Sequence, residues 1–240
     1  MKKSTVVSLM LSPVASMLIG PAAWPQNLMI PPPLQGKIQA IQAASRENEQ
    51  RLHTYQWIET TTVTINGHSK PPMQSICRYA PDGTILKTSL GAQQQPPMPS
   101  GGPLMRHVEK MKIEEVQESL SQIRGLMGRY LPPAPGTLQQ AFQTRPVGFE
   151  HNGAMENSVV IHDYVKQGDS LSLELGPPMM GLRGIRVNTY LESVSDPVTA
   201  IVQFATLPDG THYPGVTTIN APAKGIFIST EQSNFSKAIQ

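Results

Sequence analysis

The stretch that decides the fold is residues 182–235, in which segments of strand composition follow one another closely. β-branched and aromatic residues, which favour half-buried strands, recur in all of these segments. Short polar turns such as Pro208-Asp209-Gly210-Thr211 separate them, as is typical of antiparallel strands joined by hairpins. The sequence therefore predicts four consecutive antiparallel strands: LRGIRVNTYL at 182–191, PVTAIVQF at 197–204, YPGVTTI at 213–219 and IFIST at 226–230.

The same strand pattern occurs earlier in the chain, on both sides of a helical insert. Asn66-Gly67 lies between two such runs and is a strong hairpin signal, because both residues tolerate positive φ. Pro71-Pro72 predicts a bulge or bend, since proline cannot donate to a sheet ladder. The remaining strands are expected at residues 55–66, 68–79 and 84–90 before the insert, and near 147, at 158–165 and at 170–175 after it.

Apolar residues at three- to four-residue spacing predict amphipathic helices at residues 34–52 and 104–131, and a short helix at 136–144. An antiparallel sheet needs its apolar face covered, and these helices are the material available for that. We therefore predict an α+β fold: a curved antiparallel sheet or incomplete β-barrel of about nine to ten strands, with helices covering the concave face. The apolar stripe of the second helix consists of Leu104, Val108, Met111, Val116, Leu120, Ile123, Met127 and Tyr130.

The N-terminus has the pattern of a cleaved secretory signal peptide. Lys2 and Lys3 precede an apolar run at residues 6–19, and the small residues Gly20-Pro21-Ala22-Ala23 follow. The run is shorter than the roughly 20 residues of a spanning helix, so we expect no stable membrane span and a periplasmic or secreted protein. We assign residues 1–23 to the signal peptide, 24–33 to a proline-rich leader, and 34–235 to a single half-barrel domain with a helical insert at about 104–145.

Composition excludes one large class of partners. The chain has 19 Lys and Arg against 17 Asp and Glu, so loss of Lys2 and Lys3 with the signal peptide leaves no net charge. There is no basic run, and aromatic residues make up only 5%, so we expect no nucleic-acid binding. Cys77 is the only cysteine. It allows no internal disulfide, and we expect a small buried strand residue there rather than a reactive thiol.

The order of elements resembles the LolA-like fold of periplasmic lipoprotein carriers. That family has an exported chain, a leading helix, a three-strand meander, an inserted helical segment and a long run of antiparallel strands. The nearest local match is Asp209-Gly210-Thr211-His212-Tyr213-Pro214, an Asp-Gly turn followed by an aromatic-Pro step. The resemblance implies a half-barrel whose apolar concave face, covered by helices, holds acyl chains or another apolar ligand. It implies functions that range from lipoprotein transport to envelope-stress sensing.

One pair of short motifs resembles an enzyme. Gly168-Asp169-Ser170-Leu171 is the tetrapeptide of GDSL-type lipases and esterases, and Asp209 stands three residues before His212, as in that family. A serine nucleophile also needs a base within reach and oxyanion donors, whereas Ser170 starts an alternating strand. The histidines are scattered, without the close pairs of zinc sites. We expect no enzyme, no catalytic residue, no metal and no cofactor; a hydrolase using Ser170 and His212 is a remote alternative.

The first functional hypothesis is therefore a binding protein for a hydrophobic, acyl or lipid-like ligand, acting as a carrier or a sensor. Its expected partners are lipid or lipoprotein acyl chains. The alternative is an envelope protein–protein interaction module with a filled core. Methionine adapts to varied apolar surfaces and occurs 12 times, which suits either a cavity or a core. The residues expected to line a cavity are Trp57, Ile65, Val108, Met111, Leu120 and Met127.

Overall fold

The computed structural model describes residues 47–91, 103–151, 157–176 and 182–238. The predicted signal peptide and leader lie outside these residues. So does most of the first predicted helix, of which residues 47–52 are described and are helical. Within the described ranges, no helix has both the length and the apolar character needed to cross a lipid bilayer.

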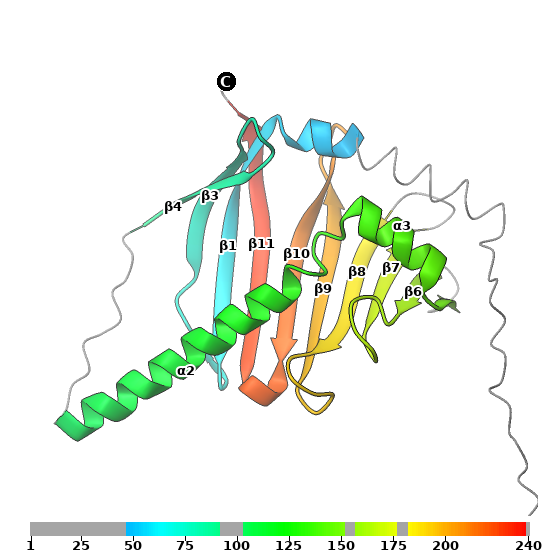
Figure 1. Cartoon of the computed structure of the whole chain (residues 1–240). Coiled ribbons are helices and arrows are strands. Elements are labelled where there is room, and N and C mark those ends of the chain that lie inside the picture. Colours follow the sequence, from blue (N-terminus) through cyan, green and yellow to red (C-terminus); the bar gives the residue numbers. More distant parts are fainter. Residues whose placement is uncertain (1–46, 92–102, 152–156, 177–181, 239–240) are drawn as a thin grey trace, which may run out of the picture.

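One antiparallel sheet of 11 strands organises the molecule (Figure 1). Its strand order is β4-β3-β1-β11-β10-β9-β8-β7-β6-β5, and β2 pairs with β1 off this path. The first and last strands of the described chain, β1 and β11, lie side by side in the middle of the sheet. The strands are β1 (Tyr55–Ile65), β2 (His68–Ser69), β3 (Met73–Tyr79), β4 (Ile85–Ser89), β5 (Val147–His151), β6 (Asn157–His162), β7 (Ser170–Leu175), β8 (Leu182–Tyr190), β9 (Pro197–Thr206), β10 (His212–Ala221) and β11 (Ile226–Lys237).

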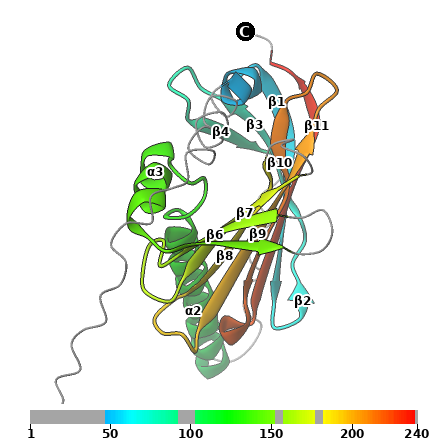
Figure 2. The same ribbon diagram turned by 90° about the vertical axis from the view of Figure 1, so that its right-hand side faces the viewer.

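The sheet is curved and stays open, with β4 and β5 as its two edges. The helices α2 (Pro103–Met127) and α3 (Pro135–Thr144) lie on the same, concave side (Figure 2). The predicted α+β incomplete barrel is therefore confirmed. The four consecutive strands predicted in residues 182–235 are β8 to β11.

Three element boundaries differ from the prediction. The sheet has 11 strands rather than nine or ten, because residues 68–79 form two strands separated around Pro71-Pro72. Proline has no N–H for the ladder, so pairing stops there. β11 continues to Lys237 because β1 provides paired residues along its whole length. α2 ends at Met127 rather than at residue 131, close to two glycines that disfavour helix.

The main core lies between the C-terminal half of α2, α3 and the concave face of β6 to β11. Burial alternates along most of β8 and β9, since successive side chains point to opposite faces, whereas Ser158 to Ile161 of β6 are all buried. A short 3-10 helix, Pro222–Lys224, joins β10 to β11 beneath this core. The buried apolar cluster consists of Ile123, Leu126, Met127, Tyr130, Ala141, Phe142, Val159, Ile161, Tyr164, Leu171, Leu173, Ile185, Val187, Val198, Ala200, Val202, Ala221 and Ile226.

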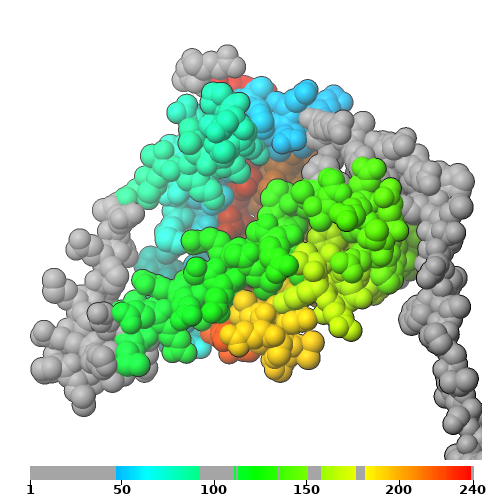
Figure 3. Space-filling view, viewed as in Figure 1, coloured from blue at the N-terminus to red at the C-terminus, as the bar shows by residue number. Residues whose placement is uncertain are grey.

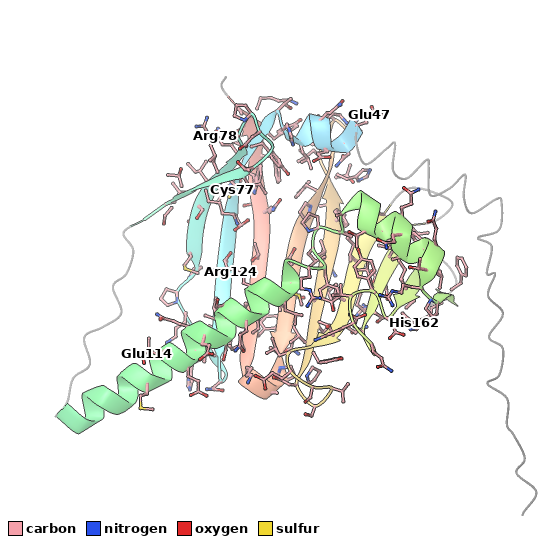
Figure 4. All side chains as sticks on the ribbon, in the orientation of Figure 1. Glu47, Cys77, Arg78, Glu114, Arg124 and His162 are labelled. Carbon is pink, nitrogen blue, oxygen red and sulfur yellow. The ribbon has the colours of Figure 1, made fainter. Side chains whose placement is uncertain are left out.

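Cys77 lies in β3 near the end of the sheet that is uppermost in Figure 4. Its side chain is fully buried and forms no disulfide. Burial, together with the nearby charge of Glu59, raises the pKa of the Cys77 thiol. A thiol of raised pKa is a poor nucleophile at neutral pH, so the prediction of a small buried strand residue is confirmed.

Candidate functional site

The concave face of the sheet continues from the core to the opposite side of the molecule. Directly paired residues in an antiparallel ladder have side chains on the same face. Val63 of β1 pairs with Ile228, Ile228 with Ile219, and Ile219 with Ala200. Ala200 belongs to the buried cluster beneath the helices. Val63 and the residues of β1 that alternate with it therefore face the same side as α2 and α3.

We call the concave face of β6 to β9, with α3 and the C-terminal half of α2, the filled half. Its sheet positions carry apolar side chains such as Ile161, Leu171 and Val187, each with no exposed surface. From the helices, Ile123 and Phe142 are buried in the same cluster. This half is packed, so it offers no space for an apolar ligand among these side chains.

A hydrogen-bonded group fixes the end of α2 to the filled half. Tyr130 is fully buried. Its hydroxyl donates to Asp169 Oδ2 at 2.5 Å and lies 2.8 Å from Thr189 Oγ1. The Asp169 carboxylate also accepts from the backbone N–H groups of Val165 and Lys166. Burial, and then the bond to Asp169, raise the pKa of Tyr130 well above its ordinary value of 10.0. The C-terminal end of α2 is thus held against β8 and the start of β7.

We call the concave face of β1, β3, β4 and β11 the open half. The N-terminal half of α2 crosses in front of it, and Figure 3 shows a hollow between α2 and these strands, with β11 visible at its floor. Met73 and Ile85 share this face through their pairing with Thr61 and Tyr79, and they are 59% and 44% exposed. Ile113 on α2 is 39% exposed. Apolar side chains therefore remain exposed on the sheet side of the hollow and on the N-terminal half of α2.

Two pairs of polar side chains lie on the floor of the open half. The Thr61 and Thr230 hydroxyl oxygens are 3.2 Å apart. Lys87 Nζ lies 2.7 Å from Glu59 Oε1, and the two side chains are 50% and 14% exposed. A partly exposed pair of this kind contributes little to stability, about 1 kcal/mol at most. Because Glu59 and Lys87 are paired with each other, as are Thr61 and Thr230, these four side chains do not require a polar group from a ligand.

Five aromatic side chains lie at the end of the open half that is uppermost in Figure 1. Tyr55, Trp57, Tyr79, Tyr213 and Phe235 form what we call the aromatic group. Trp57 is stacked on Phe235, with 5.7 Å between ring centroids and 15° between planes, and its centroid lies 5.4 Å from that of Tyr79. Phe235 also contacts Tyr213 and Tyr55. The group joins β1, β3, β10 and β11, so one end of the open half is closed by large rings.

The helix at residues 47–52 lies over this end of the sheet (Figure 1). Asn48 fastens it to β10, because its side-chain amide donates to the His212 carbonyl at 2.7 Å and accepts from the His212 N–H at 2.6 Å. His53, just after the helix, stacks on Tyr79 with 4.3 Å between centroids. The aromatic group is therefore covered by a short segment from the N-terminal side of the described chain.

An exposed carboxylate borders the aromatic group. Tyr55 donates its hydroxyl to Asp209 Oδ2 at 2.6 Å, and Lys237 Nζ lies 3.7 Å from the centroid of the Tyr55 ring. The hydrogen bond from Tyr55, followed by those from Thr211, lowers the pKa of Asp209 to about 2. Asp209 belongs to the Asp-Gly turn singled out in the sequence. This turn thus connects the β9–β10 hairpin to the start of β1.

The structure distributes the residues predicted to line a cavity over both halves. Met127 is buried in the filled half, and Leu120 is partly buried against the same cluster. Trp57 belongs to the aromatic group, and Ile65 lies at the other end of β1 on the same face. The side chain of Val108 lies outside the described residues, although its backbone is part of α2.

Met111 does not continue the apolar stripe in which the sequence placed it. Its side chain is 56% exposed. At 3.6 residues per turn it lies about 120° around the helix axis from Ile123, the centre of the sheet-facing side. The predicted stripe contains a step of five residues between Met111 and Val116, which is well over one turn of helix, so the predicted single stripe was wrong at this position.

The hydrolase alternative fails on sheet geometry. Ser170 pairs with Asn188, Asn188 with Thr199, and Thr199 with Asn220, so the residue of β10 level with Ser170 is Asn220. Three strand spacings separate β7 from β10, or about 14 Å, and His212 lies a further eight residues along β10, or about 27 Å. His212 Nδ1 is instead 2.9 Å from the Thr206 hydroxyl. Ser170 and His212 are about 30 Å apart and share no site.

Within the described ranges, no three His, Cys, Asp or Glu residues are grouped so that they could hold a metal ion. An open depression lies beside the C-terminal end of α2, lined by Gln122, Gly125, Leu126, Arg129, Leu191 and Glu192. Its lining includes the charged side chains Arg129 and Glu192 and it is open to solvent, so it is not an enclosed cavity. The hollow of the open half remains the best candidate.

Comparison with known proteins finds similarity in the overall fold. No protein-family model matches the chain, and no curated protein matches it. Among solved structures, a DUF1329 family protein from Desulfovibrio piger is similar, with 8% identity, a TM-score of 0.42, and coverage of 86% of this chain and 94% of that one.

Two further solved structures are similar at the same level. A LolA superfamily protein from Nitrosomonas europaea has 10% identity and a TM-score of 0.35, over 83% of this chain and 94% of that one. A domain described as an outer membrane lipoprotein-sorting protein, from Vibrio parahaemolyticus, has 10% identity and a TM-score of 0.37, over 83% and 93%. Identities and scores this low concern the overall fold and decide nothing about function.

Two features of the concave face were not predicted from the sequence. Tyr130 was assigned to an apolar stripe and Asp169 was noted in the lipase-like tetrapeptide, and their hydrogen bond joins residues 39 positions apart. The pair Glu59 and Lys87 joins β1 to β4 across β3. A polar residue at an inward position of an otherwise apolar strand is the signal that could have indicated Glu59. The partners themselves depend on register, which the sequence does not state.

Proposed function

We propose that this protein binds an apolar chain, such as the acyl chain of a lipid or lipoprotein, in the hollow of the open half. It would do so as a carrier or sensor after export to the periplasm or secretion. The observation that supports this is the unequal packing of α2. Its C-terminal half is buried against the sheet, whereas its N-terminal half borders the hollow, with exposed apolar side chains on the helix and on the sheet.

The driving force for such binding is the removal of apolar surface from water. Burial of apolar surface is favourable by roughly 25 cal/mol per Å², or about 0.8 kcal/mol per methylene of the ligand. The face of β1 between Trp57 and Ile65 extends for about 27 Å at the rise of a strand, which accommodates an extended acyl chain. The paired polar groups on the floor, Thr61 with Thr230 and Glu59 with Lys87, need no polar group from the ligand.

In this proposal the predicted lining residues have different roles. Trp57 and Ile65 lie at the two ends of the hollow, and the segment of α2 that carries Val108 and Met111 borders it. Leu120 and Met127 support the site indirectly, because they hold the C-terminal half of α2 on the filled half.

Two neighbouring threonines provide a matched test. Thr61 and Thr62 are consecutive in β1, both are partly buried, and they point to opposite faces of the sheet. Thr61→Arg puts a charged side chain into the hollow, and Thr62→Arg puts the same side chain on the other face. We expect Thr61→Arg to weaken binding of a dansyl-labelled fatty acid at least tenfold, and Thr62→Arg to leave it within about twofold.

Binding is measured by dansyl fluorescence titration, with native mass spectrometry to establish the stoichiometry. Equal affinity in both variants would place the ligand elsewhere, and absence of saturable binding to the unmodified chain would contradict the proposed function. Circular dichroism of both variants controls for folding, since each adds one arginine to the same strand.

A second function, binding of an extended segment of another envelope protein, is favoured by the edge strand β4. All five residues of β4 are exposed, including Ile85 and Leu86, and a strand edge offers unpaired backbone groups to a partner strand. Along β4 the N–H groups point alternately to β3 and to the free edge. Leu90 donates to the Gln74 carbonyl, so the N–H of Ser89 faces the edge, and Ser89→Pro removes this donor. Loss of a pulled-down envelope partner with Ser89→Pro, together with unchanged fatty-acid binding, would favour this function over the first.

A further inference from the structure

We propose that the indole N–H of Trp57 donates a hydrogen bond to the acyl carbonyl oxygen of the ligand. The polar end of the ligand then lies in the aromatic group, and its apolar chain runs along β1 toward Ile65. This inference rests on the proposed function and adds to it the orientation of the ligand and the chemical group that is recognised.

The indole N–H of Trp57 is a buried donor without a hydrogen-bond partner in the described part of the chain. The Trp57 side chain is 3% exposed, and its Nε1 has no hydrogen-bond partner among the described residues. A buried N–H without an acceptor is uncommon, because the group gives up its hydrogen bonds to water and receives none in return. Polar atoms beside it do have partners, since Tyr55 bonds to Asp209 and Glu59 to Lys87. Trp57 is therefore a buried member of the aromatic group whose donor has no partner in the described chain.

Neighbouring side chains do not supply the acceptor. Trp57 is stacked on Phe235 with 15° between ring planes, and an indole N–H lies in the plane of its own ring, so it cannot point at the Phe235 face. Cys77 is paired with Trp57 across the ladder, but sulfur is a weak acceptor, and its Sγ is directed to the Ser75 carbonyl at 3.9 Å. A ligand oxygen is the group whose chemistry complements this donor.

A second unpartnered donor lies in the segment that covers the aromatic group. Arg51 belongs to the helix at residues 47–52, and its Nε is buried without a hydrogen-bond partner in the described chain. A guanidinium is always charged and only donates. A neutral donor in the aromatic group and a cationic residue in the segment over this end of the sheet suit a carbonyl oxygen, whether it belongs to an ester or to a free carboxylate. Because Trp57 Nε1 is buried, entry of this oxygen requires the aromatic rings or the helix at 47–52 to shift.

Three probes with the same apolar chain separate the possibilities. Laurate carries a carboxylate, methyl laurate an ester carbonyl, and dodecyltrimethylammonium no acceptor at all. The chain has two tryptophans, so Trp24→Phe leaves Trp57 as the single source of an indole ¹⁵N–¹H resonance. We expect laurate and methyl laurate to move this resonance downfield, and dodecyltrimethylammonium to leave the proton near its ligand-free position.

Trp57→Phe keeps an aromatic ring but removes the indole donor together with part of the ring volume, for which the probe without an acceptor is the control. We expect it to weaken binding of laurate and methyl laurate about tenfold, or about 1.4 kcal/mol, and to change binding of dodecyltrimethylammonium less than twofold. The resonance measurement is independent of this variant, so the inference can be tested even where Trp57→Phe folds poorly. Arg51→Gln then identifies the source of the oxygen: weaker binding of laurate alone indicates a free acid, and unchanged binding of both indicates an ester.

Failure of the inference and failure of the proposed function give different results. If all probes bind but the indole resonance does not move, or Trp57→Phe weakens all three equally, the carbonyl assignment is wrong and acyl binding stands. If none of the probes binds in a saturable manner, both are wrong.

Discussion

The filled half and the open half belong to one continuous sheet and are crossed by one helix, yet only the filled half is packed. In the filled half, inward positions of the strands carry Ile161, Leu171 and Val187. In the open half, comparable positions carry Glu59, Thr61 and Ser75, which share a face by register. The same helix α2 is buried at its C-terminal end and borders a hollow at its N-terminal end. The difference therefore arises from the inward residues of the strands.

This difference explains why the hollow persists. Direct packing of α2 on the open half would bury the ion pair between Glu59 and Lys87, and removal of both charges from water is costly. A polar floor thus keeps the helix from collapsing onto the sheet, while the hydrogen bonds of Tyr130 hold its other end in place. The comparison teaches that a polar group inside a half-barrel can preserve space for an apolar ligand.

The largest expected effect comes from replacing an isoleucine by alanine, once in the filled half and once in the open half. Ile161→Ala in β6 removes a side chain with no exposed surface, whereas Ile85→Ala in β4 removes one that is 44% exposed. We expect Ile161→Ala to lower the free energy of unfolding by about 2–4 kcal/mol and Ile85→Ala by about 0.5 kcal/mol or less. Urea denaturation followed by circular dichroism measures both. Similar losses in the two variants would mean that the open half is packed like the filled half.

The next effect concerns the attachment of α2. Tyr130→Phe removes a hydroxyl that bonds to Asp169 and Thr189 and leaves the buried carboxylate short of a donor, so we expect a loss of about 2 kcal/mol. Tyr190→Phe is the control, because its hydroxyl bonds to the Gln167 carbonyl at an exposed position, and its loss is expected to be about 0.5 kcal/mol or less. Equal losses would show that the buried group does not anchor the helix.

Tyr130 also makes the stability of the folded chain depend on pH. The pKa of Tyr130 in the folded chain is raised, chiefly by burial, so deprotonation at high pH favours the unfolded chain. Stability from this group is complete below pH 10.0, the ordinary pKa, and is lost as the pH rises above it. Burial also raises the pKa of Tyr79 and Tyr164, so Tyr130→Phe should flatten the alkaline decline without abolishing it. An unchanged slope between pH 9 and 12 would contradict the assignment.

The smallest expected effect is at the border of the open half. The pKa of Asp209 is lowered to about 2, first of all by the hydrogen bond from Tyr55. Its contribution to stability is present above pH 3.8 and is lost as the pH falls toward 2. Tyr55→Phe should raise the pKa of Asp209 toward 3.8, as measured by NMR titration of the carboxyl carbon. Asp82, whose pKa is lowered by Thr84, is the internal control and should not change.

Much of the architecture could be predicted from local patterns. The Asn66-Gly67 hairpin forms with Asn66 at φ 50° and Gly67 at φ 79°, as the turn chemistry requires. The alternation in residues 170–175 matches the burial of Leu171 and Leu173 in β7. These features depend on neighbours within a few residues, so the sequence contains the whole of the information needed.

The candidate site was less accessible to sequence analysis. Helical spacing placed Met111 and Met127 in one stripe, but one is exposed and the other is buried, because only part of α2 packs on the sheet. The role of Trp57 depends on Phe235, which is far along the chain and joins β1 through the β1–β11 ladder. Long-range pairing of this kind has no local signal.

The sequence by itself determined the strands, the helices, their order and the open α+β sheet, because periodicity and turn chemistry act over short distances. The tertiary structure alone decided which inward positions face a helix and which face a hollow. That choice depends on the pairing of β11 with β1 and on the anchoring of α2 through Tyr130 and Asp169. Both bring together residues that are distant in the chain, so their physical effect exists only after the sheet has formed.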